Sequence, residues 1–289
     1  MEQFSGHNRT RFTFLFILLF YILAAYKLWQ GMWMFQMQPH FFNTRFDGTT
    51  WLFMQTGIHQ WLLDNKGGWV LFDALFYIMP LLYWFVYKRN IKWASWVAVI
   101  MLLINWMYVQ CYTLYPTNSI EGHVGWLLYP FVLMTIRLKS FYFLMNAMRY
   151  FFLFFFASAA IWKLRQGGAF NPEQMSGVLL MQHKEYLVSA PDYWYTHFIY
   201  WLVKHRAVGY VLYLAGTVLE LAFIAGFFTK KYDRLLLVFF IAFLIMDLFI
   251  MRIPYFEILP MALPLLFSKY GEPETTTVRQ EPATSASGG

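Results

Sequence analysis

Cysteine and the compact motifs of soluble enzymes are scarce or missing in this chain of 289 residues. The one cysteine, Cys111, excludes an intramolecular disulfide and any metal or iron–sulfur site built from several cysteines. Glycine-rich nucleotide loops, a Gly-x-Ser-x-Gly elbow and the His-x-x-His or His-Glu-x-x-His spacings are absent as well. The sequence therefore offers no motif for a nucleotide, hydrolase or metal site, and we expect no bound metal.

Charged residues are also few, at 13% of the chain, whereas hydrophobic residues make up 60% and aromatic residues 22%. This composition differs from that of a soluble domain and is typical of a polytopic membrane protein. The net charge of +7 comes from Lys and Arg in short segments between apolar runs, where such residues determine topology. We therefore expect membrane lipid, and not nucleic acid, as the partner.

Six apolar runs are long enough, or nearly so, to cross a bilayer, which needs about 20 residues. They are 12–35, 69–87, 93–114, 141–163, 208–228 and 235–251. Two shorter runs, 124–136 and 255–267, contain prolines and are typical of broken helices that neighbouring helices shield from lipid. The sequence predicts an all-α integral membrane bundle of about eight spans. If the two short runs do not cross the membrane, the bundle has six spans.

Lys and Arg gather in five short segments that fall on one side of the membrane if there are eight spans. These segments lie near 9–11, 88–92, 137–139, 230–234 and 269. The positive-inside rule then predicts that both termini are cytoplasmic, and we expect the membrane to be a bacterial inner membrane. On the outer side, 51–63 and 172–187 are predicted to form interfacial amphipathic helices rich in Trp, Met and Leu.

The two halves of the chain share one order of elements: long span, outer interfacial helix, span, basic loop, span and short broken span. Without a gap, 68–72 aligns with 209–213, although identities are sparse. We therefore predict two parallel four-helix repeats, 1–140 and 141–270. The segment 271–289 has almost no apolar residues and is predicted to be a disordered tail.

Ionisable residues inside spans are the candidate functional residues, because lipid makes them costly unless they are paired or face a cavity. Arg149 and Glu220 each lie about 8 residues, or roughly 12 Å, from the cytoplasmic end of their spans. We therefore expect them to form a structural ion pair, with a proton relay as the alternative interpretation.

A second polar group is predicted toward the outer face. Lys163 ends the span 141–163, Asp247 lies in the outer half of a later span, and Glu257 follows near the same surface. Lys27 ends the first span in a similar way. A lysine near carboxylates in a partly dry crevice is either an anchor that snorkels to the interface or a base tuned by burial. Lys163 is therefore a candidate base, with Asp247 and Glu257 beside it in an outward-facing crevice.

The stretch 151–164, Phe-Phe-Leu-Phe-Phe-Phe-Ala-Ser-Ala-Ala-Ile-Trp-Lys-Leu, resembles the membrane domain of vitamin K-dependent gamma-carboxylase. It is equally similar to the bacterial relatives of that enzyme, the horizontally transferred transmembrane (HTTM) proteins. The likeness continues at 218–228, and the loop 229–233 resembles that of small DoxX-like membrane proteins. The resemblance implies that Lys163 stands at the position of the family's catalytic lysine, a base in reduced-quinone oxidation, and that a quinone is the candidate cofactor.

Two departures from the carboxylase pattern limit what the resemblance implies. Where that pattern carries a histidine, this chain has Met246 and Asp247. We also expect the large lumenal domain of the carboxylases to be absent after the last span. We therefore expect quinone- or lipid-linked redox chemistry rather than carboxylation of a protein. Two alternatives remain open: a non-catalytic scaffold or complex subunit, whose polar residues only hold helices together, and a small-molecule transporter, which would need a continuous polar path.

Overall fold

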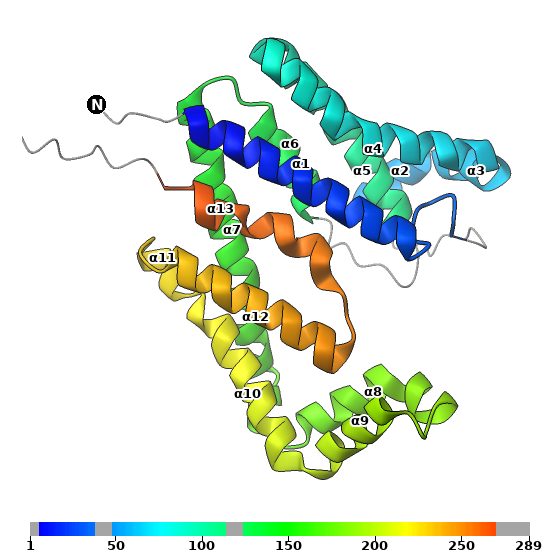
Figure 1. The fold of residues 1–289 in the computed structure, drawn as a ribbon, viewed down its shortest axis with the longest axis vertical. Coiled ribbons are helices and arrows are strands. Elements are labelled where there is room, and N and C mark those ends of the chain that lie inside the picture. The colour runs from blue at the N-terminus through cyan, green and yellow to red at the C-terminus, as the bar shows by residue number, and fades with distance from the viewer. Residues whose placement is uncertain (1–5, 38–47, 114–123, 270–289) are drawn as a thin grey trace, which may run out of the picture.

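The computed structural model describes residues 6–37, 48–113 and 124–269, and these residues form helices joined by loops, without a strand among them. Six of the described helical segments are long and apolar enough to cross a membrane. They are α1 (Gly6–Trp29), α4 (Lys66–Arg89), α5 (Ile91–Thr113), α7 (Leu138–Arg165), α10 (Arg206–Ala222) with its extension α11 (Ala225–Phe228), and α12 (Asp233–Met251). The predicted all-α membrane bundle is confirmed (Figure 1). The predicted tail, 271–289, lies outside the described residues.

The two short proline-bearing runs lie inside the bundle, and both lead to the same end of it. They form α6 (Val124–Leu133) and the continuous pair η3 (Tyr255–Ala262) and α13 (Leu263–Phe267). At the end where α1 begins, Arg9 donates to the Thr135 and Ile136 carbonyls, which follow α6. At the same end, Lys230 donates to the Ser268 carbonyl, 2.9 Å away, after α13. The described residues thus contain six long helices that can cross a membrane and two short segments packed among them, and eight spans stays a prediction.

The short segments are shielded, as predicted. Most side chains of η3 and α13 are buried, and so are Trp126, Tyr129, Val132 and Leu133 of α6. The Pro260 carbonyl accepts the Leu263 N–H within the segment, and the Tyr129 hydroxyl of α6 donates a second hydrogen bond to it. Pro264, four residues on, has no N–H to donate. Neighbouring protein therefore satisfies backbone groups that lipid could not.

The predicted interfacial helix at 51–63 is split into α2 (Gly48–Gln55) and α3 (Ile58–Asp64). Gly57 between them has φ 70°, a left-handed conformation that glycine adopts at little cost and that ends a helix. The two short helices lie beside the start of α4 and the end of α5 (Figure 1).

The second predicted interfacial helix, at 172–187, is α8 (Gln174–Ser189), and it is followed by α9 (Trp194–Lys204), which was not predicted. Buried Tyr195, Ile199 and Leu202 share one face of α9, whereas Trp194 and Trp201 are exposed. The helices α8 and α9 pack together as a hairpin at the end of the molecule farthest from α4 and α5 (Figure 1).

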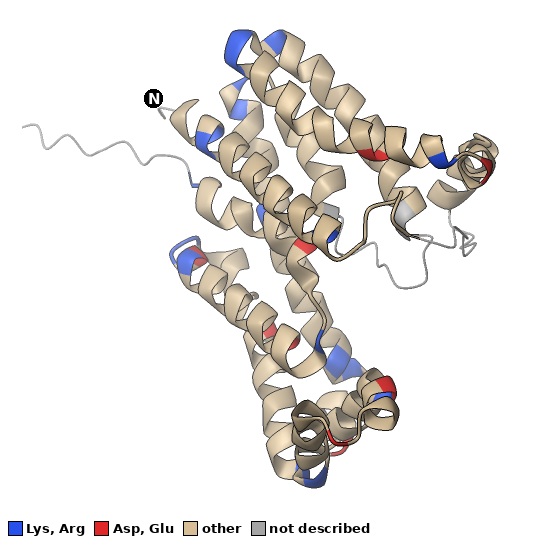
Figure 2. Ribbon diagram, turned by 45° about the vertical axis from the view of Figure 1, so that its right-hand side comes forward, with Lys and Arg blue, Asp and Glu red and all other residues tan. Residues whose placement is uncertain are grey.

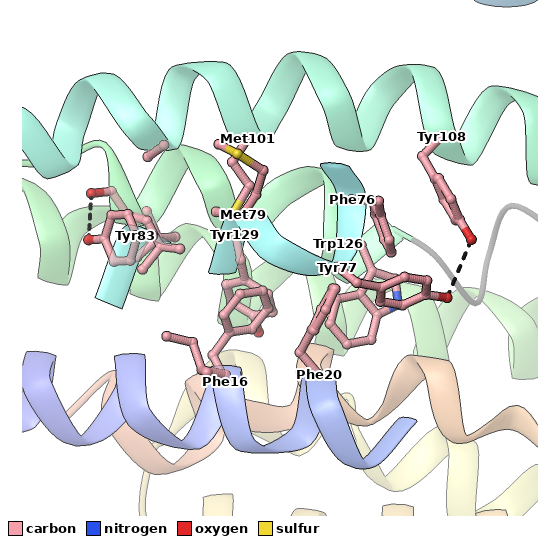
Figure 3. Packing of buried hydrophobic residues seen from close by; sticks show 14 of the residues in the cluster. Phe16, Phe20, Phe76, Tyr77, Met79, Tyr83, Met101, Tyr108, Trp126 and Tyr129 are labelled. Carbon is pink, nitrogen blue, oxygen red and sulfur yellow. Dashed lines mark hydrogen bonds between the residues drawn. The ribbon is translucent and has the colours of Figure 1, made fainter. Parts of the chain in front are cut away.

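Aromatic side chains fill the core between α1, α4, α5 and α6 (Figure 3). The rings of Phe20 and Trp126 are 5.0 Å apart and meet edge to face, and Phe76 stacks on Tyr108 at 3.8 Å. Lipid tails are as apolar as these side chains, so close packing rather than the hydrophobic effect holds helices together at this depth.

Helix α7 belongs to two cores. Its first part contributes Phe141, Tyr142 and Met145 to the core of α1, α4, α5 and α6, whereas Phe152 and Phe156 pack with α10, α12 and η3. The C-terminal segment 255–267 is shared between the two cores in the same way. The cores therefore meet between Met148 and Phe152 of α7, and the division and duplication of the two halves near residue 140 stay predictions.

Charged residues gather at the ends of the long helices and are sparse along their middles (Figure 2). The predicted pair of Arg149 with Glu220 is wrong. The Arg149 side chain, 1% exposed, binds Asp233 with two hydrogen bonds of 3.0 and 2.6 Å, and it also donates to the carbonyls of Gly226 and Thr229. With 28 residues, α7 is about 42 Å long, more than the roughly 30 Å of a bilayer core, so residue counts from its end do not give depth.

The contact of α11 with Arg149 depends on Gly226, a residue of α11. A Cβ atom at Gly226 would lie 2.5 Å from Cδ2 of Leu153 on α7, so the absence of a side chain allows the close approach. The approach brings the Gly226 carbonyl within 2.8 Å of Nη2 of Arg149. The buried guanidinium therefore holds α7, α11 and α12 together at the end where α1 begins.

The substitution Arg149→Met should strongly destabilise the protein, because it leaves the carboxylate of fully buried Asp233 without its partner. Breaking one side of a buried pair costs about 3–5 kcal/mol, whereas replacing both charges by apolar groups is often neutral. We expect a lower unfolding temperature for Arg149→Met in detergent, and substantial recovery in the double variant Arg149→Met/Asp233→Leu. A double variant no more stable than the single one would contradict this account.

Candidate functional site: a charged trio between two cavities

Three charged side chains from three helices meet near the end of α7, away from the Arg149–Asp233 pair, and we call them the charged trio. They are Lys163 from the last turn of α7, Glu220 from α10 and Asp247 from α12. The Lys163 Nζ donates to both carboxylate oxygens of Glu220, at 2.7 and 2.9 Å. The side chain of Lys163 is 30% exposed and that of Glu220 only 4%.

Asp247 is the surplus carboxylate of the trio. It lies close enough to Lys163 and Glu220 to interact with both electrostatically, yet its carboxylate makes no hydrogen bond within the described residues. With all three groups ionised, the trio has a net charge of −1. An ammonium has three N–H donors, of which Glu220 engages two, so Lys163 retains one.

A cavity of about 300 Å³, here called cavity A, lies against Lys163 and Asp247. Its walls come from α7, α8, α10 and α12 and are mostly apolar, with Gln174 and Tyr213 as further polar groups. Ligand sites in proteins typically have this size and this lining, with a few placed polar groups that orient the ligand. The free N–H of Lys163 and the carboxylate of Asp247 thus provide a donor and an acceptor in one apolar space.

A second cavity of about 250 Å³, cavity B, lies against Glu220. Its walls come from α7, α10, α12 and η3 and include Phe155, Ala159 and Leu244. The ring of Phe243 lines both cavities. The Lys163–Glu220 pair and Phe243 therefore separate cavity A from cavity B.

Helix α8 forms one wall of cavity A, and side chains of the α8–α9 hairpin fasten it to the end of α12. The last carbonyls of a helix lack partners within the helix. Tyr195 and His183 donate to the Ile250 carbonyl at 2.7 and 2.8 Å, and Gln182 donates to the Met251 carbonyl at 3.3 Å. The hairpin therefore caps α12 and holds α8 in the wall of cavity A with the same contacts.

Arg252, directly after α12, makes further contacts with the α8–α9 hairpin. It has φ 53°, a left-handed conformation that is uncommon for a residue other than glycine, and it ends α12. Its guanidinium lies over the rings of Tyr195, Tyr186 and Tyr193, at 4.0, 4.7 and 5.5 Å. Cation–π contacts with three tyrosines of the hairpin thus hold the chain in this turn.

The prediction that Glu257 lies beside Lys163 is wrong. It pairs with Lys27 of α1 at 3.2 Å, and it is not among the residues that line cavity A or cavity B. Its position after the last long span gives its depth but not its lateral position in the bundle. Of the predicted crevice residues, Lys163 and Asp247 therefore lie together, whereas Glu257 lies with Lys27.

Asp73, the only acidic residue of α4, was not predicted as a buried polar site. Its carboxylate accepts hydrogen bonds from the backbone N–H groups of Met34 and Phe35 and from the Tyr108 hydroxyl, at 3.2, 3.0 and 2.6 Å. Tyr108 in turn shares a hydrogen bond with Tyr77 (Figure 3). A single carboxylate in an apolar run was the available signal. Here it fixes the turn after α1 to α4 and α5.

Comparison with known proteins gives no match to a family model, to a curated protein or to a solved structure. Within the described part of the chain, no cluster of His, Cys, Asp and Glu could hold a metal ion. The site is therefore characterised by its own geometry: a lysine held by one carboxylate, a second carboxylate without a hydrogen bond, and a cavity on each side.

Docking of the α8–α9 hairpin should weaken as the pH falls. Burial lowers the pKa of His183 below its usual 6.5, nearby Arg252 lowers this pKa further, and the hydrogen bond to Ile250 opposes both effects. Because the docked state binds the proton less readily than the undocked state, its stability is full above pH 6.5 and is lost as the pH falls through the lowered pKa.

Spin labels on exposed Lys184 and Leu248 would report this docking. We expect the distance distribution from double electron–electron resonance to broaden between pH 7.5 and pH 5. The variant His183→Gln keeps a donor but does not titrate, so its distribution should not change over that range. Equal pH dependence in both proteins would contradict the role of His183.

Proposed function

We propose that this multi-pass membrane protein binds an amphipathic molecule of the quinone class in cavity A and takes part in its proton exchange and redox chemistry. The observation that carries the proposal is Asp247, a carboxylate that lines an apolar cavity and accepts no hydrogen bond from the described residues, next to a lysine with one free N–H. A head group with a hydroxyl or carbonyl oxygen matches this pair, since Lys163 donates and Asp247 accepts.

The trio assigns different roles to Lys163 and Asp247. In a reduced quinone, the O–H bond of one hydroxyl breaks, the proton passes to the Asp247 carboxylate, and Lys163 stabilises the oxygen anion that remains. Electrostatic stabilisation of this kind is strong in a site from which water is excluded. Lys163 could act as the base only after its two hydrogen bonds to Glu220 open, whereas Asp247 has no such restraint.

The resemblance of 151–164 to the membrane domain of the carboxylase and HTTM proteins supports a reduced quinone as the ligand. It aligns Lys163 with the catalytic lysine of that family, and the trio places this lysine at the edge of cavity A. Asp247 lies where the family pattern has a histidine, another group able to accept a proton. We therefore propose a carboxylase-like quinone site without carboxylation of a protein.

The same proposal includes the orientation of the chain. Basic segments near 9–11, 88–92, 137–139 and 230–234 adjoin the helix ends opposite the charged trio (Figure 2). By the positive-inside rule these ends are cytoplasmic, as are both termini, and cavity A then opens near the outer face of a bacterial inner membrane.

Mass spectrometry of the protein purified from native membranes should detect one co-extracted molecule of the quinone class per chain. The variants Asp247→Asn and Lys163→Met should each retain at least about tenfold less of it, the effect of losing one hydrogen bond to a charged group. Glu173→Gln is the matched control, because Glu173 is an exposed carboxylate that pairs with Arg206 at the surface. Absence of any quinone, or equal retention by all variants, would contradict the proposal and favour a scaffold.

Single cysteines at Asn90 and Asp192, both exposed, test the orientation. In intact cells, a membrane-impermeant maleimide should label Asp192→Cys and should not label Asn90→Cys. The native Cys111 is buried and provides no competing site. The reverse pattern would overturn the proposed orientation.

A further inference from the structure

Cavity B is lined mainly by apolar side chains, with Glu220 and Tyr255 as its polar wall residues. Its one charged wall residue is Glu220, and both oxygens of that carboxylate already accept hydrogen bonds from Lys163. The rest of its wall is aromatic or aliphatic apart from Tyr255. An apolar cavity of about 150 Å³ stays dry and binds benzene, so a cavity of about 250 Å³ can hold a hydrocarbon group.

Cavity B is also next to the site proposed for the ligand head. Phe243 lines both cavities, and its ring meets that of Phe156 edge to face, 5.7 Å away, on the side of cavity B. The Lys163–Glu220 pair lies between the two spaces, with Lys163 in the wall of cavity A and Glu220 in that of cavity B. Rotation of the Phe243 ring would connect the two cavities without breaking this ion pair.

We infer that cavity B holds the apolar chain of the ligand whose head lies in cavity A, and that Phe243 and Ala159 determine which chain is accepted. This inference rests on the proposed function and narrows the ligand class to amphiphiles that carry a hydrocarbon chain. The small side chain of Ala159 leaves space in the wall of cavity B, and Phe243 is the ring that the chain must pass. Because lipid competes equally well for a hydrocarbon chain, selectivity arises from packing in cavity B rather than from the hydrophobic effect.

Menaquinone-4 and menadione are suitable probes, because they share a naphthoquinone ring and only the first has an isoprenoid chain. Binding of both is measured with the purified full chain in one detergent. We expect Ala159→Phe, which fills cavity B, to weaken menaquinone-4 binding at least tenfold and to leave menadione binding within twofold. We expect Phe243→Ala, which joins the cavities, to increase the preference for menaquinone-4 over menadione.

The matched control is Ala242→Phe, the same change one residue from Phe243 on the face of α12 that carries exposed Ile241 and Ile245. It should alter binding of neither probe. Ala159→Leu is a milder filling of cavity B, should Ala159→Phe lower the unfolding temperature. Unchanged menaquinone-4 binding in folded Ala159 variants, or an equal loss of both probes, would overturn the inference. If neither probe bound the unmodified protein, the proposed function would fail first, and the inference with it.

Discussion

Each charge that helix α7 carries into the apolar part of the bundle has to meet a partner of opposite sign, and the second half of the protein is arranged around this requirement. Fourteen residues, or about 21 Å, separate Arg149 from Lys163. Arg149 binds Asp233 at the start of α12, and Lys163 binds Glu220 of α10. Lipid neither solvates nor screens such charges, so α7, α10 and α12 are held together at two depths.

The same requirement is met in the first half, but with a different result. Lys27 ends α1 and pairs with Glu257, much as Lys163 ends α7 and pairs with Glu220. The cavity next to Lys27 is only about 20 Å³, room for about one water molecule, because rings such as Phe20 fill the space. The two lysines therefore have similar partners but different surroundings. Only the Lys163 pair separates two cavities large enough for a ligand, which favours a binding role there and a structural role for Lys27.

Hydropathy and proline positions were sufficient to predict the six long helices and the two shielded short segments. They could not predict which charges meet, because that depends on tilt and lateral position, neither of which residue counts contain. Arg149 was correctly singled out as a buried cation, yet its partner, Asp233, lies at a helix start in a loop that folds back onto α7. Helix α9 was missed because its apolar face is short and interleaved with polar residues, and it is ordered by packing against α8.

The α8 wall of cavity A and the position of Asp247 both depend on the last turn of α12. The carbonyls of Ile250 and Met251, which the α8–α9 hairpin caps, lie three and four residues after Asp247. An uncapped helix end frays first in its last turn, so release of the hairpin would loosen the segment that holds the surplus carboxylate. Release would also remove Gln174, Met175 and Val178 of α8 from the wall of cavity A, so that more water reaches Asp247 and Lys163 and weakens their interaction with a head group. The hairpin therefore keeps one wall of the cavity and the carboxylate in place through the same hydrogen bonds.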